Sequence, residues 1–441
     1  MRSQEEEAFP REPIHRITGP LERFLHVEAA SGAVLLVCAA AALAIANSDW
    51  AEAYLAFWEM PLGLSLGEWE LEHSLRHWVN DGLMAIFFFV IGLEVKREIA
   101  LGELRSPRRA ALPLAGALGG MLVPAGVYLL LQGSGPARDG WGIPMATDIA
   151  FVVGCMAILG PRIPPGLRVF LLSLAIADDI GAVLAIAIGY TDAIQWIALG
   201  LGLAGILIIA LLARMGVRSL LVYTLFGTAV WFAFHESGVH ATIAGVILGL
   251  QTPASTYLER SRLGRLLDRA RGLVHGEAWE EGRRRVDQVR ELRRATREAV
   301  SPLEYIESVL HPWVGFAIMP IFALANAGVP FRPTDLLDPV AVAVAAGLVV
   351  GKPLGVIAFA ALAVRLRLTT LPEGVSWGAV AGAAFLAGIG FTMALFIAGL
   401  ALEGPELDAA KVGVLSGSVV AAGLGAGVLV WRLPKPSTGA R

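Results

Sequence analysis

Two adjacent acids, Asp178 and Asp179, are the residues of this sequence best suited to chemistry. They lie near the middle of the apolar run 171–184, where a buried charge costs roughly 2.5–3.5 kcal/mol on insertion scales. Two acids without a function would cost too much to keep there for packing alone. Successive helix positions point about 100° apart, so each carboxylate can address a different neighbour. One could hold a cation while the other meets a partner charge.

Lys352 is the natural partner for these carboxylates. It lies about halfway along the apolar run 337–363, directly before Pro353, which loosens the helix locally. A lone lysine in such a place must lose its proton or find an anion. The alternative is that its long stem carries the ammonium group to the membrane surface, which the central position disfavours. We therefore expect Lys352 to lie near a buried anion.

Two polar interruptions of apolar segments suggest broken helices. Asp148 and Thr147 follow Pro144 at the start of a short segment, and a similar irregularity, 388–392, lies within segment 375–400. Paired interruptions in two halves of a chain are typical of a transporter site at the middle of the membrane. Asp148 would there offset the positive N-termini of helices. Packing by glycine and threonine is the alternative that the pattern leaves open.

Two further groups carry weaker signals. Glu94 and Glu98 flank Lys96 and Arg97 after the second apolar segment, at spacings that fit charge pairs on a helix surface. Taken alone, this stretch is typical of a flank that ends a membrane segment. His240 lies near the outer end of the eighth segment, where an isolated histidine more often packs than senses protons.

These residues must be positioned by an all-α polytopic membrane protein. Of the 441 residues, 56% are hydrophobic and only 17% are charged, and the mean hydropathy is +0.65, which is more apolar than a soluble domain tolerates. We expect twelve transmembrane helices. The apolar segments lie near 31–47, 76–95, 110–131, 144–160, 167–189, 194–213, 218–234, 239–250, 310–328, 337–363, 375–400 and 408–431.

Basic residues orient these segments. With the N-terminus in the cytoplasm, 30 of the 35 lysines and arginines fall in cytoplasmic segments, as the positive-inside rule requires. We therefore expect a multi-pass protein with both termini cytoplasmic: a segment 1–30, a twelve-span domain 31–431 and a tail 432–441. The acidic run 5–7 indicates that the first apolar stretch is retained and not cleaved as a signal peptide. A net charge of −3 offers no basic surface for nucleic acid.

Two loops within the domain stand out. Residues 48–72, expected outside, alternate in a way compatible with a hairpin that turns at Gly63 or Gly67, although an irregular loop fits the pattern equally. Residues 253–300 contain 12 arginines and 8 acidic residues and predict a charged helical insert in the cytoplasm. These charges fit a solvated face, and attraction to anionic lipid headgroups is the alternative.

Taken together, these motifs closely resemble the NhaA family of sodium/proton antiporters, from about residue 30 to residue 430. The matching stretches follow the family's order; they are 80–84, 92–98, 146–151, 177–181, 237–245, 310–313, 324–328, 351–355 and 388–393. The sequence departs from the family in its long 253–300 insert and in Ala394, where a serine commonly follows the Phe-Thr-Met motif. The insert adjoins Glu307 and so affects the transfer of pH-sensing details more than that of the ion site.

The resemblance implies an NhaA-type fold with inverted repeats and two discontinuous helices that cross. Asp178 and Asp179 would form the cation and proton site, where Na⁺ or Li⁺ binds. Lys352 would pair with Asp178 in one state, and Thr147 and Asp148 would belong to the helix crossing.

The resemblance also implies roles for residues nearer the surfaces. Glu94, Glu98 and Glu307 would contribute to a pH-responsive cytoplasmic funnel; Asp81, His240 and His311 are weaker candidates. The loop 48–72 would be a hairpin through which two copies form a homodimer.

We therefore expect an antiporter of the bacterial inner membrane, and not an enzyme, that exports Na⁺ or Li⁺ and imports protons for sodium and pH homeostasis. Protons and cations would compete for the same carboxylates, and the broken-helix bundle would move to expose the site alternately. No cofactor is expected, because the proton gradient supplies the work.

Two alternatives come from other classes. An intramembrane aspartyl protease needs aspartates that face each other across helices, whereas Asp178 and Asp179 are sequence neighbours. A passive cation channel can also carry a ring of acids, but its flux would not be coupled to protons.

Overall fold

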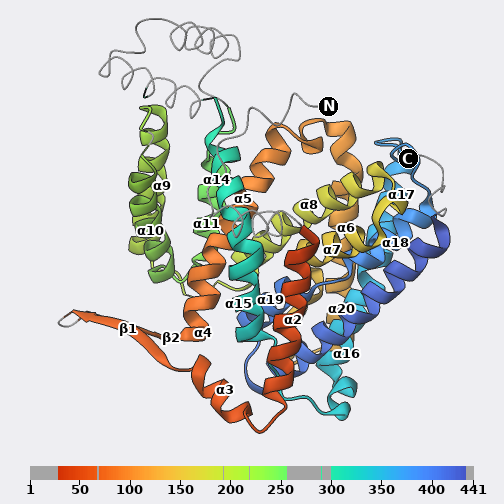
Figure 1. Cartoon of the computed structure of the whole chain (residues 1–441), viewed down its shortest axis with the longest axis horizontal. Helices are drawn as coiled ribbons and strands as arrows, with labels where there is room; N and C mark the ends of the chain where they lie inside the picture. Colours follow the sequence, from red (N-terminus) through yellow and green to blue (C-terminus); the bar gives the residue numbers. More distant parts are fainter. Residues whose placement is uncertain are drawn as a thin grey trace, which may run out of the picture.

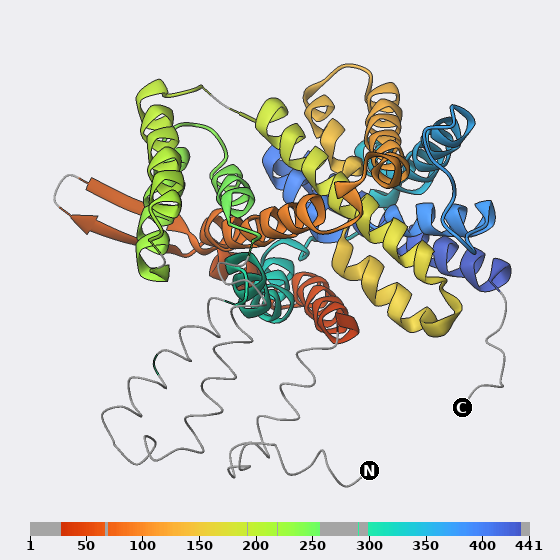
Figure 2. The ribbon, with the colours of Figure 1, turned by 90° about the horizontal axis from the view of Figure 1, so that it is seen from above.

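The computed structural model describes residues 28–66, 69–191, 193–217, 219–255, 290 and 299–433. Within these ranges the chain is a bundle of helices with one small hairpin (Figure 1, Figure 2). The expected all-helical, membrane-type fold is therefore confirmed. Most of the 253–300 insert, the 1–30 segment and the 432–441 tail lies outside the described residues.

Among the described residues, eight helical segments are long and apolar enough to cross a membrane. They are Leu75–Ala100 (α4, η1 and α5), Pro107–Gln132 (α6), Pro136–Leu159 (η3 and α7), Pro165–Gly189 (α8), Trp196–Arg214 (α9), Pro302–Asn326 (α14, η6 and α15), Pro339–Arg365 (α16, η8 and α17) and Gly404–Arg432 (α20).

Two bent helix pairs raise this number to ten if each pair is one span. Helices α2 (Glu28–Ala46) and α3 (Ala51–Trp58) meet at 118°, and α18 (Trp377–Ala387) and α19 (Phe391–Ala401) meet at 45°. Helices α10 (Leu220–Glu236) and α11 (Thr242–Gln251) have 17 and 10 residues, short of the about 20 that cross a bilayer. Length and composition thus support eight to ten of the twelve expected spans.

The helices differ in how deeply they lie in the bundle. In the most apolar stretch of α8, 78% of the residues are buried, against 17% in α9. Figure 1 and Figure 2 both place α9 and α10 at the edge of the molecule, apart from the main bundle. The two central aspartates are therefore on the helix that the protein encloses most fully.

Glycines let two helices pack tightly beside this centre. A Cβ atom at Gly119 of α6 would collide with the carbonyl oxygen of Gly355 of α17, and one at Gly355 would collide with that of Gly119. The two helices therefore touch backbone to backbone, as small residues allow in membrane proteins. A Cβ at Gly120 would lie 3.5 Å from Cε of Lys352, so α6 also packs along the lysine stem.

A two-stranded antiparallel hairpin leaves the bundle between α3 and α4. Strand β1 (Pro61–Leu66) pairs with β2 (Trp69–Ser74), and the register joins Gly63 to Glu72 and Leu66 to Trp69. Gly63 is therefore within a strand and does not form the turn, and Gly67, the other glycine expected there, lies outside the described residues. Figure 1 and Figure 2 show the hairpin projecting away from the helices.

Candidate functional site

The site is built around a buried ion pair between α8 and α17. Nζ of Lys352 lies 2.6 Å from Oδ2 of Asp178, and both side chains are fully buried. The ammonium group also donates to the carbonyl oxygen of Met145 at the end of η3 (Pro136–Met145). The structure thus pairs Lys352 with Asp178, one of the two adjacent aspartates that stand out in the sequence.

A local change of helix geometry precedes Lys352. Residues Gly347–Gly351 form a π-helical turn (η8), and α17 begins at Lys352 with Pro353 in its first turn. Short π-helical turns inside α-helices occur often at functional sites. Lys352 then lies between α6 and α8, where it contacts Asp178 and packs beside Gly120.

Asp179 differs from its neighbour because it forms no ion pair with any of the described residues. Its side chain is buried, with 2% of the residue exposed, and Oδ1 accepts no hydrogen bond from a described residue. The same holds for Oδ1 of Asp178. Unsatisfied carboxylate oxygens are rare in protein interiors because they are costly. Two of them on adjacent residues make a place where a proton or a small cation would be stabilised.

Beside this pair, two chain segments lose helical geometry. Residues 146–148, between η3 and α7 (Ile149–Leu159), are not helical, and neither are residues 389–390, between α18 and α19. The amide of Asp148 donates to the carbonyl oxygen of Ile389 at 2.7 Å. The two interruptions therefore lie against each other.

Asp148 and Thr147 satisfy the helix ends that these interruptions expose. Asp148 caps α7 by accepting from the amide of Phe151 at 3.3 Å, and its other oxygen accepts from both the amide, at 3.0 Å, and the hydroxyl of Thr392 in α19. Thr147 donates its hydroxyl to the carbonyl of Ala387, the last residue of α18, at 2.8 Å. The carboxylate of Asp148 thus lies at the N-termini of α7 and α19, and the hydroxyl of Thr147 lies at the C-terminus of α18. Helix dipoles favour both arrangements.

A second group of polar residues lies on α5 (Met84–Ala100) and α14 (Pro302–Trp313). Glu307 forms an ion pair of 2.5 Å with Arg97, and Glu94 lies 3.7 Å from Nδ1 of His311. Two of the three acids that the sequence singled out here, Glu94 and Glu307, and His311 thus take part in contacts between α5 and α14.

Glu98, the third of these acids, touches α8 itself. Its Oε1 accepts from the hydroxyl of Ser173 at 2.8 Å and from the amide of Glu103 at 3.0 Å. Ser173 lies five positions before Asp178 on the same helix. Sequence analysis did not identify Ser173, Arg97 or Thr392 as site residues, because serine, a flanking arginine and a threonine are all common in membrane helices without a special role.

Two weaker candidates lie elsewhere. Asp81 contacts two histidines, with Oδ2 at 3.5 Å from Nε2 of His77 and 3.4 Å from Nδ1 of His235. His240 lies two residues before α11, and its buried Nε2 makes no hydrogen bond to a described residue. Neither belongs to the contacts that hold the aspartate pair.

Comparison with known proteins gives one consistent answer. The family model described as Na⁺/H⁺ antiporter 1 matches residues 22–429. The chain is 54% identical to the Na⁺/H⁺ antiporter NhaA of Rhodopirellula baltica, over 97% of this chain and 98% of that protein. It is 53% identical to the Na⁺/H⁺ antiporter NhaA of Rhizobium meliloti, over 95% of each. A solved sodium proton antiporter from Methanocaldococcus jannaschii shares 12% identity, with a TM-score of 0.48, over 95% of this chain and 99% of that chain.

Proposed function

Because the chain belongs to the Na⁺/H⁺ antiporter 1 family, and so exchanges sodium ions for protons, we propose that Asp178 and Asp179 are where the two ions compete. The observation that carries this assignment is the unpaired carboxylate of Asp179, buried next to an aspartate that a lysine already neutralises. The NhaA resemblance of the sequence is confirmed by the same relatives.

Charge balance gives the exchange its physical basis. Lys352 and Asp178 neutralise each other, whereas Asp179 forms no ion pair with a described residue and is neutral only with a proton or a cation bound. Replacing a proton by Na⁺ at Asp179 leaves the buried charge unchanged, and binding both at once would leave a net positive charge in a place where charge is costly. The two ions therefore exclude each other. Li⁺ has the same charge and is proposed as an alternative cargo.

Alternating access would involve the crossing of α7 with α18 and α19. We place there the two discontinuous helices of an NhaA-type inverted-repeat fold, held together by Asp148 and Thr147. Because these segments meet through hydrogen bonds at their ends and not through a continuous helix, they can move relative to the surrounding bundle. Movement would open the aspartates to one side of the membrane at a time.

Glu94, Glu98 and Glu307 are proposed to line the cytoplasmic approach to the site and to make it respond to pH. The contact between Glu98 and Ser173 supports this role, because it connects the acidic group to the helix that carries both aspartates. His311 would join through Glu94. The proton gradient supplies the work, so no cofactor is proposed.

The membrane arrangement is a proposal as well. We propose twelve spans within residues 31–431, formed by the eight long segments, α2, the pair α18–α19, and the shorter helices α10 and α11. The proposed orientation places the segments 1–30, 253–300 and 432–441 on the cytoplasmic side of a bacterial inner membrane. The hairpin in 48–72 would then project outside, where two copies could pair through their strands as a homodimer.

This orientation predicts opposite labelling of two single cysteines. In a chain whose Cys38 and Cys155 are replaced by serine, a cysteine at Leu62, which is 55% exposed in the hairpin, should react with an impermeant thiol reagent applied to intact cells. A cysteine at Ala270, in the arginine-rich insert that resists translocation, should react only after the membrane is opened. The opposite pattern would invert the topology.

Everted vesicles distinguish this function from its alternatives. Adding Na⁺ should dissipate an established proton gradient in a saturable way. Na⁺ flux that leaves the gradient untouched would indicate a channel. The protease alternative is further disfavoured because both aspartates belong to one helix, α8, and Asp178 is occupied by Lys352.

A further inference from the structure

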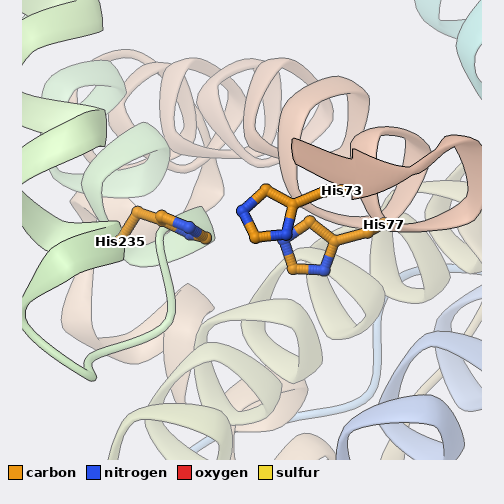
Figure 3. Close-up of side chains that lie close together, drawn as sticks. All are labelled: His73, His77 and His235. Carbon is orange, nitrogen blue, oxygen red and sulfur yellow. The ribbon is translucent and has the colours of Figure 1, made fainter. Parts of the chain in front are cut away.

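Three histidines converge at the base of the hairpin. His73 is in β2, His77 is the last residue of α4 (Leu75–His77), and His235 is in the last turn of α10. One ring nitrogen from each lies within 4.8 Å of the others. Figure 3 shows His235 facing the other two rings from the opposite side. Among the described residues, this is the group suited to a metal ion through three or more side chains.

We propose that His73, His77 and His235 bind a divalent transition-metal ion of the Zn²⁺ class. Imidazole nitrogen is a preferred ligand of Zn²⁺, Ni²⁺ and Cu²⁺, and three protein ligands with a fourth position open to water is a common arrangement for zinc. The proposal concerns a site separate from Asp178 and Asp179 and does not depend on the transport function.

A carboxylate is placed to support these ligands. Oδ2 of Asp81 lies 3.5 Å from Nε2 of His77 and 3.4 Å from Nδ1 of His235. Metal-binding histidines commonly have a carboxylate beside the imidazole that orients the ring and raises its basicity. The negative charge of Asp81 would also offset part of the charge of a divalent cation. Asp81 does not belong to the contacts of the aspartate pair, and here it would support the metal ligands.

Aromatic contacts keep the three imidazole rings near one another. His73 and His77 stack with centroids 4.1 Å apart, and His235 stacks on Trp231 at 5.7 Å. Trp231 in turn donates its indole N–H to the backbone carbonyl of Asp81. Metal–nitrogen bonds of about 2.0–2.1 Å require ligand atoms roughly 3.3 Å apart in a tetrahedral site. Binding therefore needs rotation of the side chains to bring the three nitrogens closer together.

The bound ion would connect parts of the chain that are remote in sequence. The hairpin leads directly into α4, which begins the long segment Leu75–Ala100, whereas α10 belongs to the peripheral pair with α9 (Figure 1). A metal held by all three would fix the hairpin to α10 and so set the direction in which the hairpin projects. Its role is structural, and the expected consequence of removing it is a looser hairpin.

Cobalt titration tests the site directly. The full chain is purified in detergent through a tag without histidine, stripped with a chelator and titrated with Co²⁺ alone. We expect one Co²⁺ per chain, with the intense visible absorption of tetrahedral cobalt, displaced by Zn²⁺. His73→Gln, His77→Gln and His235→Gln should each weaken binding by on the order of 100-fold, and Asp81→Asn by about 10-fold to 100-fold. His275→Gln, a matched change elsewhere in the chain, should leave it unchanged.

Two outcomes would overturn the proposal. One is cobalt binding of equal strength in the wild type and in the triple glutamine variant, which would show adventitious binding only. The other is weak absorption of octahedral cobalt in the wild type. If a glutamine variant fails to fold, the proposal is tested on the wild-type chain. Stoichiometric Co²⁺ should quench its tryptophan fluorescence, and excess Zn²⁺ should restore the fluorescence. Trp231→Phe should reduce the part of the signal that Co²⁺ quenches. Absence of any such quenching contradicts the site.

Discussion

Asp179→Asn is expected to abolish Na⁺/H⁺ exchange and to leave the chain folded and inserted. Asparagine keeps the shape of aspartate but has no negative charge to bind a cation and no proton to release. Because Asp179 has no partner in the structure, its loss strands no other charge, and neutralising a buried acid removes an unfavourable term from folding. Everted vesicles that contain the variant should show no dissipation of the proton gradient on addition of Na⁺.

Asp49→Asn is the matched control for this experiment. Asp49 is exposed, in the turn between α2 and α3, so the same chemical change should leave exchange at the wild-type rate. The size-exclusion profiles of both variants should equal that of the wild type. The melting temperature should be unchanged in Asp49→Asn and at least as high as the wild-type value in Asp179→Asn. Coupled exchange by a correctly inserted Asp179→Asn protein would remove Asp179 from the ion site.

The second large effect concerns the stability of the ion pair between Lys352 and Asp178. Removing one member of a fully buried pair leaves the other charge uncompensated and costs about 3–5 kcal/mol, whereas removing both is often nearly neutral. Lys352→Gln and Asp178→Asn should each lower the melting temperature sharply. The double variant should recover most of that loss, because neither charge remains. A double-mutant cycle on melting temperature in detergent measures the coupling.

Lys411 provides the comparison for this cycle. It is also a buried lysine, with 5% exposed, but it belongs to α20, and its charged neighbours are Asp408, Arg76 and Glu59. The effects of Lys411→Gln and Asp178→Asn should therefore add without recovery. If the effects of Lys352→Gln and Asp178→Asn also simply add, the two residues are not coupled, and the lysine must be assigned another partner.

The sequence was sufficient to predict those site residues that stand out because a charge is costly in an apolar environment. Asp178, Asp179 and Lys352 stand out because no other charged residue lies within 169–189 or within 339–363, and charge balance then points to a pair. Charge balance alone does not say which aspartate pairs with the lysine; only the family resemblance implied Asp178. That choice depends on the rotation of α8 relative to α17, which follows from packing between helices that are remote in sequence and not from any local pattern.

Contacts between segments that are far apart in the chain could not be predicted from the sequence. The pairs Arg97–Glu307 and Ser173–Glu98 join residues 210 and 75 positions apart, and each partner taken alone has an ordinary explanation. The three histidines at the base of the hairpin were not noticed for the same reason, because His235 is remote from His73 and His77 in sequence. Only the folded chain brings such groups together.

Span counting shows a different limit. Hydropathy treats α10 and α11 as full segments, but α11 has only 10 helical residues and is preceded by the non-helical His240. A short or broken helix and a full span have similar composition, so an apolar segment of 12 to 17 residues does not fix the number of crossings. The hairpin turn was likewise ambiguous between two glycines until the strand register excluded Gly63.

The central claim, that Na⁺ displaces protons from the buried aspartates, is tested most directly by proton release from the purified protein. The stripped chain is held in weakly buffered detergent solution with a pH indicator, at a pH where exchange is active, and Na⁺ is added, with choline as the control cation. The account predicts saturable acidification by Na⁺ and none by choline, and no Na⁺-induced release from Asp179→Asn. Equal release from the wild type and Asp179→Asn would contradict it.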